Sequence, residues 1–583
     1  MKSTKITKWL IGLVCIAGLS SCDITLYPED TITPDSYFRN ETDLELFTNS
    51  LYTSLPGTEI YEDEADIIIN MIIDDRIAGT RVVPQSGGGW SWGTLRNINY
   101  FLENADRCED KEVLAHYKGL ARFFRAYFYY DKVRKFGDVP WYDGVIGSAD
   151  KDLLHKPQDS RILVMDKVLE DLDFAIANLR SDAGSIYRIN KWAALALKSR
   201  VMLFEGTFRK YHKLGHWEEC LQECVEASET LMKEGGYKLH SSYTALFTTL
   251  DANQNKDEVI LARNYSYPLL SHGVQGYVNA AGAGAGGVTK RLADAYLMKN
   301  GTRHTERAGY ATMNFIDECK DRDPRMAATL RTPGFKKDGA ACVPDIKVAN
   351  TGYHLCKYEM GKNYESYSEV DLSIFRLGEV YLNFAEAKAE LGTLTQKDLD
   401  NSINLLRKRA GVTGNLNMAD ANAKPCEWMK SNYPNLVANA AAYGNDANLG
   451  VILEIRRERT VEFVMEGLRY WDIMRWKEGK VFEEPFLGFY IPAAGQYDLD
   501  GNGTVDYTFT SDTYTTPTAG TTLKLGTNIY VTDGDHGNLI LHGQFKRTWN
   551  EDRDYYYPIP IKERVLTNGK LKQNPGWNDG LSF

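Results

Sequence analysis

Apolar residues recur at steps of three and four along several long segments of the chain. Between Glu112 and Arg134 the apolar positions are Val113, Tyr117, Leu120, Phe124 and Tyr127. Between Ser160 and Leu179 they are Val164, Val168, Leu172, Ile176 and Leu179. This spacing places the apolar side chains on one face of an α-helix. The pattern therefore predicts an amphipathic helix over each segment.

The same pattern predicts a mainly α-helical fold. Lys191 to Phe204 is alanine-rich, and further helices are predicted near Gly215–Met232, Thr289–Met298, Leu372–Leu391, Lys397–Arg409 and Ile452–Val464. Several of these form antiparallel pairs joined by short polar turns, such as the turn at Asp182–Gly184. Leu377-Gly378-x-x-Tyr381 matches the core of a tetratricopeptide first helix. We expect tetratricopeptide-like helix pairs that stack into a solenoid-like scaffold.

Long loop-rich segments separate the predicted helices. They are rich in Gly, Asn, Thr and Tyr and comprise residues 58–100, 240–290, 300–370, 411–450 and 480–555. Loops of this length in a compact protein usually carry function. We expect them to pack as an irregular subdomain on the helical layer.

The amino terminus is typical of a lipoprotein signal peptide over residues 1–21. Lysines precede an apolar run from Trp9 to Leu19, which is shorter than the ~20 residues that a membrane-spanning helix needs. The run ends in Leu19-Ser-Ser-Cys22, which is typical of a bacterial lipobox. Cys22 would then carry the lipid and residues 22–34 would form a tether. A plain secretory cleavage site is the alternative.

Composition narrows the class of ligand. The chain has 68 basic and 79 acidic residues and a net charge of −11, which argues against nucleic acid, because phosphates favour a basic face. It has 35 Tyr, 22 Phe and 11 Trp. Such residues serve either as core packing or as surfaces on which ligands stack. Of the nine cysteines, Cys15 lies in the predicted signal peptide and Cys22 would carry the lipid. The other seven show no regular framework, so no obligatory disulfide set is predicted.

The best candidate for ligand contact is the segment from Asp74 to Asn99. It holds a Gly87–Gly89 hinge and the candidate ligand residues Asp74, Asp75, Arg81, Trp90, Trp92 and Asn97. Sugars stack their apolar faces on aromatic rings, while carboxylate, amide and guanidinium groups bond their hydroxyls. A core role for Trp92 is the alternative. Tyr267 and Tyr277, in a later loop, are further candidates.

A second motif suggests a metal. Asp498-x-Asp500-x-Asn502-Gly503-x-x-Asp506 alternates oxygen ligands around a glycine turn, a pattern that suits calcium. Phe509 stands where an EF-hand places its final glutamate, so the motif is not a full EF-hand. A short structural calcium loop and a simple polar turn are the two interpretations.

Several motifs in order along the chain resemble the SusD/RagB family. They are Leu120-Ala-Arg-Phe-Phe-Arg-Ala-Tyr-Phe-Tyr-Tyr130, Arg188-Ile-Asn-Lys-Trp-Ala-Ala-Leu-Ala-Leu-Lys198, Phe375-Arg-Leu-Gly-Glu-Val-Tyr-Leu-Asn-Phe-Ala-Glu-Ala387, Ile455 to Asp472 and Tyr556-Tyr-Pro-Ile-Pro560 with Gln573-Asn-Pro-Gly-Trp577. Within Ile455 to Asp472, Glu458, Arg459, Glu462 and Glu466 stand at helical spacing, at which acidic and basic side chains can form ion pairs. We interpret these charged residues as structural, holding the scaffold together.

The resemblance implies an outer-membrane lipoprotein that faces the cell exterior and is not an enzyme. It would bind glycans and deliver them to a SusC-like TonB-dependent transporter, with an amino-terminal region at 35–310 and a carboxy-terminal region at 311–583. In the family's prototype the early segment supplies acid, Arg and Trp contacts, which fits Asp74 to Asn99. A RagB-type peptide-binding protein, a surface glycoside hydrolase and a scaffold that binds only proteins are the alternatives. The chain contains neither HExxH nor GxSxG, so nothing specific supports catalysis.

Overall fold

The computed structural model describes residues 37–57, 63–182, 184–282 and 284–583. The predicted signal peptide, Cys22 and the tether over residues 22–34 lie outside the described residues. Within the described ranges, no helix combines the length and apolar character that crossing a bilayer requires.

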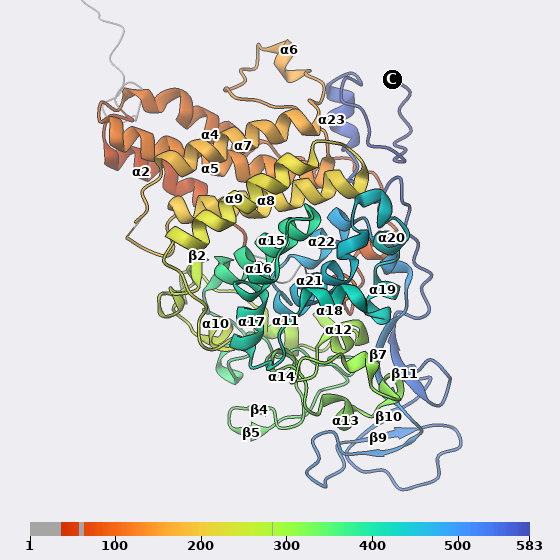
Figure 1. The fold of residues 1–583 in the computed structure, drawn as a ribbon. Coiled ribbons are helices and arrows are strands. Elements are labelled where there is room, and N and C mark those ends of the chain that lie inside the picture. The colour runs from red at the N-terminus through yellow and green to blue at the C-terminus, as the bar shows by residue number, and fades with distance from the viewer. Residues whose placement is uncertain (1–36, 58–62, 183, 283) are drawn as a thin grey trace, which may run out of the picture.

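Pairs of long helices form one layer of the molecule (Figure 1). Helix α5 (Lys111–Phe136) packs against α7 (Arg161–Asn178), and α8 (Lys191–His212) packs against α9 (Trp217–Glu234). Helices α2 (Glu41–Asn49) and α4 (Gly93–Asn104) also pack against α5. The prediction of a mainly helical scaffold is confirmed.

Local sequence explains where α5 begins and ends. The Asp110 carboxylate accepts hydrogen bonds from the amides of Glu112 and Val113, so it caps the amino end. Gly137 ends the helix with φ +71°, a conformation that favours glycine. The predicted apolar stripe from Val113 to Phe124 is buried. These signals place α5 where its periodicity predicts it.

The carboxy-terminal half adds α15 (Leu377–Glu390), α17 (Ile403–Ala410), α21 (Leu449–Glu462) and α22 (Arg469–Trp476). Shorter helices are α3 (Asp75–Ala78), α6 (Lys151–Leu154), α10 (Ala245–Thr248), α11 (Val274–Asn279), α12 (Lys290–Ala295), α13 (Phe315–Cys319), α14 (Pro324–Thr329), α16 (Gln396–Asp400), α18 (Met418–Ala423), α19 (Glu427–Asn432), α20 (Pro434–Ala438) and α23 (Ile561–Leu566).

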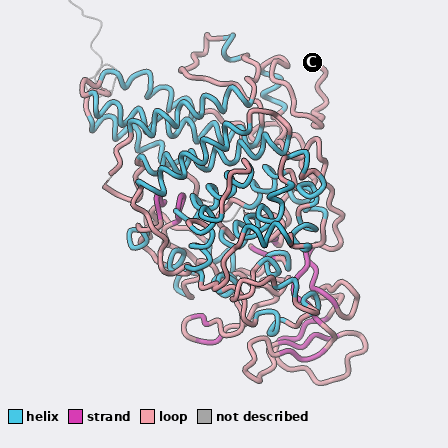
Figure 2. The backbone as a smooth tube through the Cα atoms, viewed as in Figure 1, coloured by secondary structure: helices cyan, strands magenta, loops and turns pink. Residues whose placement is uncertain are grey.

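The strands form only small sheets (Figure 2). Antiparallel pairs join β1 (Ile68–Asn70) to β3 (Ala285–Val288), β2 (Val259–Arg263) to β6 (Leu372–Arg376), β4 (Lys336–Lys337) to β5 (Ala340–Ala341) and β7 (Phe486–Ile491) to β11 (Gly537–Leu541). Strand β9 (Tyr507–Thr510) lies between antiparallel β8 (Gly495–Tyr497) and parallel β10 (Thr521–Lys524). The β2–β6 pair contacts helix α8, and the sheet of β9 and β10 lies among loops at the end of the molecule far from the long helices (Figures 1 and 2).

Several predicted elements differ from the structure. The helix predicted from Leu372 begins only at Leu377, because the preceding five residues pair with β2 as strand β6. The helix predicted over Lys397–Arg409 is divided into α16 and α17. The segment 411–450, predicted to be loop-rich, contains α18, α19 and α20, and the loop-rich segments 240–290 and 300–370 contain α10, α11, α13 and α14. Short apolar runs fit helix or strand equally well, so tertiary pairing decides between them.

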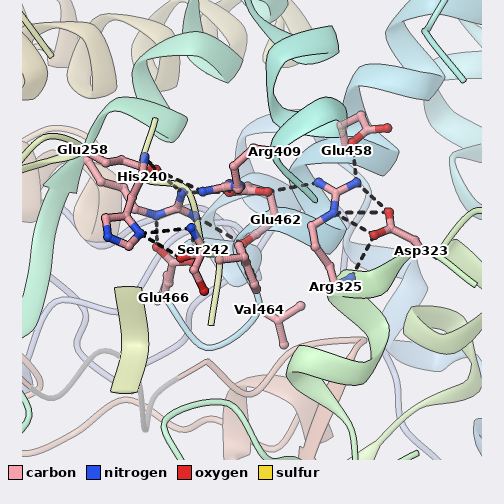
Figure 3. Close-up of polar contacts among 12 residues, drawn as sticks. His240, Ser242, Glu258, Asp323, Arg325, Arg409, Glu458, Glu462, Val464 and Glu466 are labelled. Atoms are coloured by element: carbon pink, nitrogen blue, oxygen red, sulfur yellow. Dashed lines mark hydrogen bonds and ion pairs between the residues drawn. The ribbon is translucent and has the colours of Figure 1, made fainter. Parts of the chain in front are cut away.

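A buried network of ion pairs joins α21 to its neighbours (Figure 3). The Glu462 carboxylate lies 3.0 Å from a guanidinium nitrogen of Arg325 and also pairs with Arg409. Glu458 lies 2.9 Å from Arg325, which is also held by Asp323 at 2.7 Å. The glutamates thus pair with arginines of other elements and not along their own helix. These glutamates therefore hold the scaffold together, which is the structural role that we inferred from the motif.

Candidate functional site

The two candidate tryptophans line one pocket. Trp90 is only 7% exposed and meets Trp92 edge-on, with ring centroids 5.4 Å apart. Trp92 is half-buried and packs edge-on against Tyr142 at 5.7 Å. The tryptophan pocket has a volume of 360 Å³, and its lining includes Trp90, Trp92, Arg96, Tyr142, Lys156 and Glu563. Aromatic rings and charged groups therefore share this cavity.

The two candidate aspartates line a different and larger pocket. The charged pocket has a volume of 750 Å³, and its charged lining residues are Asp74, Asp75, Arg76, Asp131, Lys132, Arg134 and Lys135. Its aromatic lining residues are Phe124, Tyr127, Phe128, Trp471 and Tyr557. They come from α5, α22 and the carboxy-terminal segment, which are far apart in the sequence.

One short segment forms a shared wall between the two pockets. Gly88, Gly89, Ser91 and Thr94 line the charged pocket, whereas Trp90, Trp92, Gly93 and Leu95 line the tryptophan pocket. The glycines at 87, 88 and 89 all have positive φ, a region that other residues rarely adopt. The sequence places the aspartates and tryptophans in one candidate site, and the structure distributes them over two adjacent pockets.

Most charges in the charged pocket are paired. Burial opposes ionisation of Asp74, but its bonds to the Arg76 guanidinium at 2.9 Å hold its pKa below the ordinary value. Asp131 lies 2.7 Å from Arg134 and 2.9 Å from Lys135. Burial likewise opposes its charge, and the two cations lower its pKa. These carboxylates remain ionised at neutral pH.

Arg81 and Asn97 line neither pocket. The Arg81 guanidinium donates a 2.6 Å hydrogen bond to the Asp554 carbonyl and lies over the ring of Tyr557 at 5.0 Å. It therefore ties the early segment to the carboxy-terminal segment. Asn97 is exposed on α4, and Asn99 lines the tryptophan pocket instead. The Asn99 amide donates to the carbonyls of Tyr142 and Gly144 at 3.0 and 3.1 Å, so it shapes that wall.

The two candidate tyrosines lie apart from the tryptophans. Tyr267 is 51% exposed and stacks on Tyr367, with centroids 4.0 Å apart and ring planes at 12°. Tyr277 is half-buried and donates a 2.7 Å hydrogen bond to the Asn70 side chain. Neither residue is in the lining of either pocket. Tyr267 and Tyr367 offer a separate aromatic surface.

Sequence reasoning missed Lys132, Tyr142 and Trp471 as lining residues. Lys132 stands in the α5 periodicity as an ordinary charged position, and Trp471 belongs to a motif that we interpret as scaffold. No sequence signal marks Lys132, because Asp131, Arg134 and Lys135 surround it in α5 and line the same pocket.

The predicted calcium loop brings three of its four residues together. Carboxylate oxygens of Asp498, Asp500 and Asp506 lie within 4.8 Å of one another. Asp498 accepts hydrogen bonds from the amides of Gly501 at 2.6 Å and Gly503 at 2.7 Å, which curl the loop around it. The Asn502 side chain instead donates to Asp500 at 3.0 Å. Three converging carboxylates fit the oxygen ligands that calcium prefers.

Comparison with known proteins covers most of the chain. A family model described as the SusD family matches residues 247–577, and a second model, described as starch-binding associating with outer membrane, matches residues 91–203. SusD-like protein P2 of Formosa agariphila is 23% identical over 516 residues, which cover 82% of this chain and 92% of that protein. SusD-like protein P38 of the same organism is 22% identical with the same coverage of each chain.

Solved structures agree in fold. A SusD-like protein from Bacteroides fragilis has a TM-score of 0.68 and 22% identity, with 94% of this chain and all of that chain covered. A structure from the same species, described as a SusD-like carbohydrate binding protein, has a TM-score of 0.66 and 20% identity, with 91% and 98% covered. Both matches show that the fold of this chain is that of SusD-like proteins. The family match spans more than half of the chain, and this protein is a member of the SusD family.

Proposed function

We propose that this chain is a lipoprotein of the outer membrane, anchored through Cys22 and facing the cell exterior, which binds glycans and delivers them to a SusC-like TonB-dependent transporter. The observation that carries the proposal is the pair of adjacent pockets on either side of Gly88–Leu95. Each combines aromatic rings with charged groups, which is the chemistry that sugar rings and their hydroxyls need.

The comparisons support the location and the ligand class. The description of the second matching family associates it with starch and with the outer membrane. One of the similar solved structures is described as carbohydrate binding. Delivery to a transporter is part of the proposal because it follows from the family resemblance.

Calorimetric titration of the mature chain with a panel of plant and host glycans and with peptides tests the proposal. Trp92→Ala removes the half-buried ring, and Arg96→Ala removes an exposed cation of the same pocket. Tyr530→Ala is a matched control, because Tyr530 is an exposed ring that lines neither pocket. We expect glycan binding that both pocket variants weaken by about tenfold or more and the control leaves intact.

Other outcomes would change the assignment. Binding of peptides alone would place the chain in the peptide-binding branch of the family. A loss of binding in Tyr267→Ala, but not in Trp92→Ala, would move the glycan site to the Tyr267 and Tyr367 surface. Transport is tested separately by deleting this protein from cells and measuring uptake of the glycan that binds.

A further inference from the structure

Lys132 of α5 is a buried cation in the wall of the charged pocket. It is 5% exposed, and its ammonium donates a hydrogen bond to the Gly89 carbonyl. The ammonium lies 4.9 Å from the centroid of the Phe128 ring and 5.9 Å from that of Trp92. A backbone carbonyl and two aromatic rings thus hold it on the segment that separates the two pockets.

Lys132 differs from the other cations of this pocket because no carboxylate pairs with it. Arg76 pairs with Asp74, and both Arg134 and Lys135 pair with Asp131. Over the described residues, Lys132 takes part in no ion pair, although an ammonium can donate three hydrogen bonds. Burial lowers the pKa of Lys132 to about 8. An unpaired buried cation is costly unless an anion compensates it.

The surroundings of Lys132 favour a negative charge in this pocket. Its lining has four cations and three carboxylates, so the pocket has an excess of positive charge although the whole protein has a net charge of −11. Thr94 lines the pocket from the first turn of α4. No side chain caps the amino end of this helix, and its first turn contains no acidic residue. Helix amino ends carry partial positive charge, which adds to the attraction for an anion. The hydroxyls of Ser91 and Thr94 add neutral donors.

We propose that the charged pocket selects acidic sugars, with the carboxylate of a uronic acid or the sulfate of a sulfated sugar bound by the Lys132 ammonium. Ser91 and Thr94 would donate to the same anion, and the half-buried Trp471 lines the same pocket. This inference rests on the proposed function, because it names the ligand class for one of the two pockets.

The test measures the affinity of the mature chain for matched pairs of oligosaccharides. One arm compares oligogalacturonate with its carboxyl-reduced form, and a second compares a sulfated galactan oligosaccharide with its desulfated form. Lys132→Met keeps an apolar side chain of similar length and removes the charge, whereas Lys132→Arg keeps the charge. Lys118→Met is the control variant. Lys118 lies on the same helix, pairs with Asp106 and is outside the pocket.

We expect an acidic oligosaccharide to bind at least about tenfold more tightly than its neutral counterpart at ~0.15 M salt. Lys132→Met should remove that difference, while Lys132→Arg and Lys118→Met keep it. The affinity of wild type should fall as the pH rises above about 8, because Lys132 loses its proton there, and Lys132→Arg should abolish this fall. The two arms distinguish carboxylate from sulfate.

Three results would overturn the inference. Equal affinity for the acidic and neutral partners would show that charge is not selected, and an unchanged difference in Lys132→Met would show that Lys132 does not select it. In both cases glycan binding, and so the proposed function, would stand. If no glycan in the wider panel bound, the proposed function itself would fail and this inference with it.

Discussion

Glu462 of α21 lies 2.8 Å from the Arg376 guanidinium at the junction of β6 and α15, and both side chains are almost fully buried. Arg325 and Arg409 contact the same carboxylate. Burial alone would raise the pKa of Glu462, but the three guanidinium groups hold it well below its ordinary value. One carboxylate of α21 therefore joins that helix to three other segments of the chain.

Loss of this carboxylate should destabilise the fold strongly. Glu462→Gln leaves buried guanidinium groups without their shared anion, and breaking a buried pair costs about 3–5 kcal/mol. Urea unfolding at neutral pH measures the change in the free energy of unfolding. Glu229→Gln is the control, because the Lys233–Glu229 pair is solvent-exposed and should contribute less than about 1 kcal/mol. Equal effects of the two variants would refute a structural role for the network.

Buried His212 should make stability fall in mild acid. Its ring is stacked on Phe208, with centroids 3.8 Å apart, and its Nε2 contacts the Met474 carbonyl at 2.9 Å. Burial lowers the pKa of His212 to about 3, whereas an unfolded histidine has a pKa of about 6.5. The lowered pKa stabilises the fold fully above about pH 6.5, and this contribution is lost as the pH falls from there towards 3.

The change in the free energy of unfolding with pH tests this effect of His212. We expect His212 to contribute about 1.4 kcal/mol of lost stability for each pH unit below 6.5. Unfolding of wild type and His212→Gln between pH 7 and 5 should therefore show a steeper loss in wild type. His216→Gln, which changes an exposed histidine, serves as control. If the free energy of unfolding of His212→Gln falls with decreasing pH as steeply as that of wild type, His212 is not the source of the acid sensitivity.

The sequence could predict the scaffold better than the pockets, for a physical reason. Helix α5 follows from a periodic stripe and a capping aspartate, both of which are local. Strand β6 could not be separated from α15, because its pairing with β2 is a contact between distant segments. Trp90 and Trp92 were found because aromatic, acidic and arginine residues stand together with a glycine hinge in one short segment. Lys132 was missed because its burial arises only when α5 packs against that segment.

Gly79 should be more sensitive to substitution than a glycine with the same backbone conformation elsewhere. It ends α3 with φ +73°, and an added Cβ would lie 2.0 Å from the Thr548 carbonyl oxygen. Gly215 has φ +75°, and nothing lies within 4 Å of its Cβ position. Both alanine variants incur the left-handed backbone cost of about 1–2 kcal/mol, but only Gly79→Ala forces backbone atoms apart.

We therefore expect Gly79→Ala to lower the free energy of unfolding by at least about 1 kcal/mol more than Gly215→Ala does. Because α3 carries Asp75 and Arg76 into the charged pocket, Gly79→Ala should also weaken ligand binding there. Urea unfolding and calorimetric titration of both variants measure the two effects. Similar stability of the two variants would mean that the Thr548 segment moves aside at little cost.

Calcium binding at the loop from Asp498 to Asp506 stays a prediction of the sequence, which the convergence of its carboxylates supports. Bound calcium would relieve the repulsion among Asp498, Asp500 and Asp506, so it should raise the midpoint of thermal unfolding. Loops of this kind in extracellular proteins bind with dissociation constants of about 10⁻⁴–10⁻³ M. Calorimetric titration of chelator-treated protein with calcium, and thermal unfolding with and without it, measure both effects.

Asp498→Asn should abolish calcium binding, because Asp498 organises the loop through four backbone amides. Asp512→Asn is a matched control, because Asp512 lies nearby in sequence, is exposed and pairs with Lys524. We expect that control to bind calcium as wild type does. If wild type shows neither heat of binding nor a shift in unfolding at millimolar calcium, the segment is a polar turn, and the hydrogen bonds to Asp498 alone account for its shape.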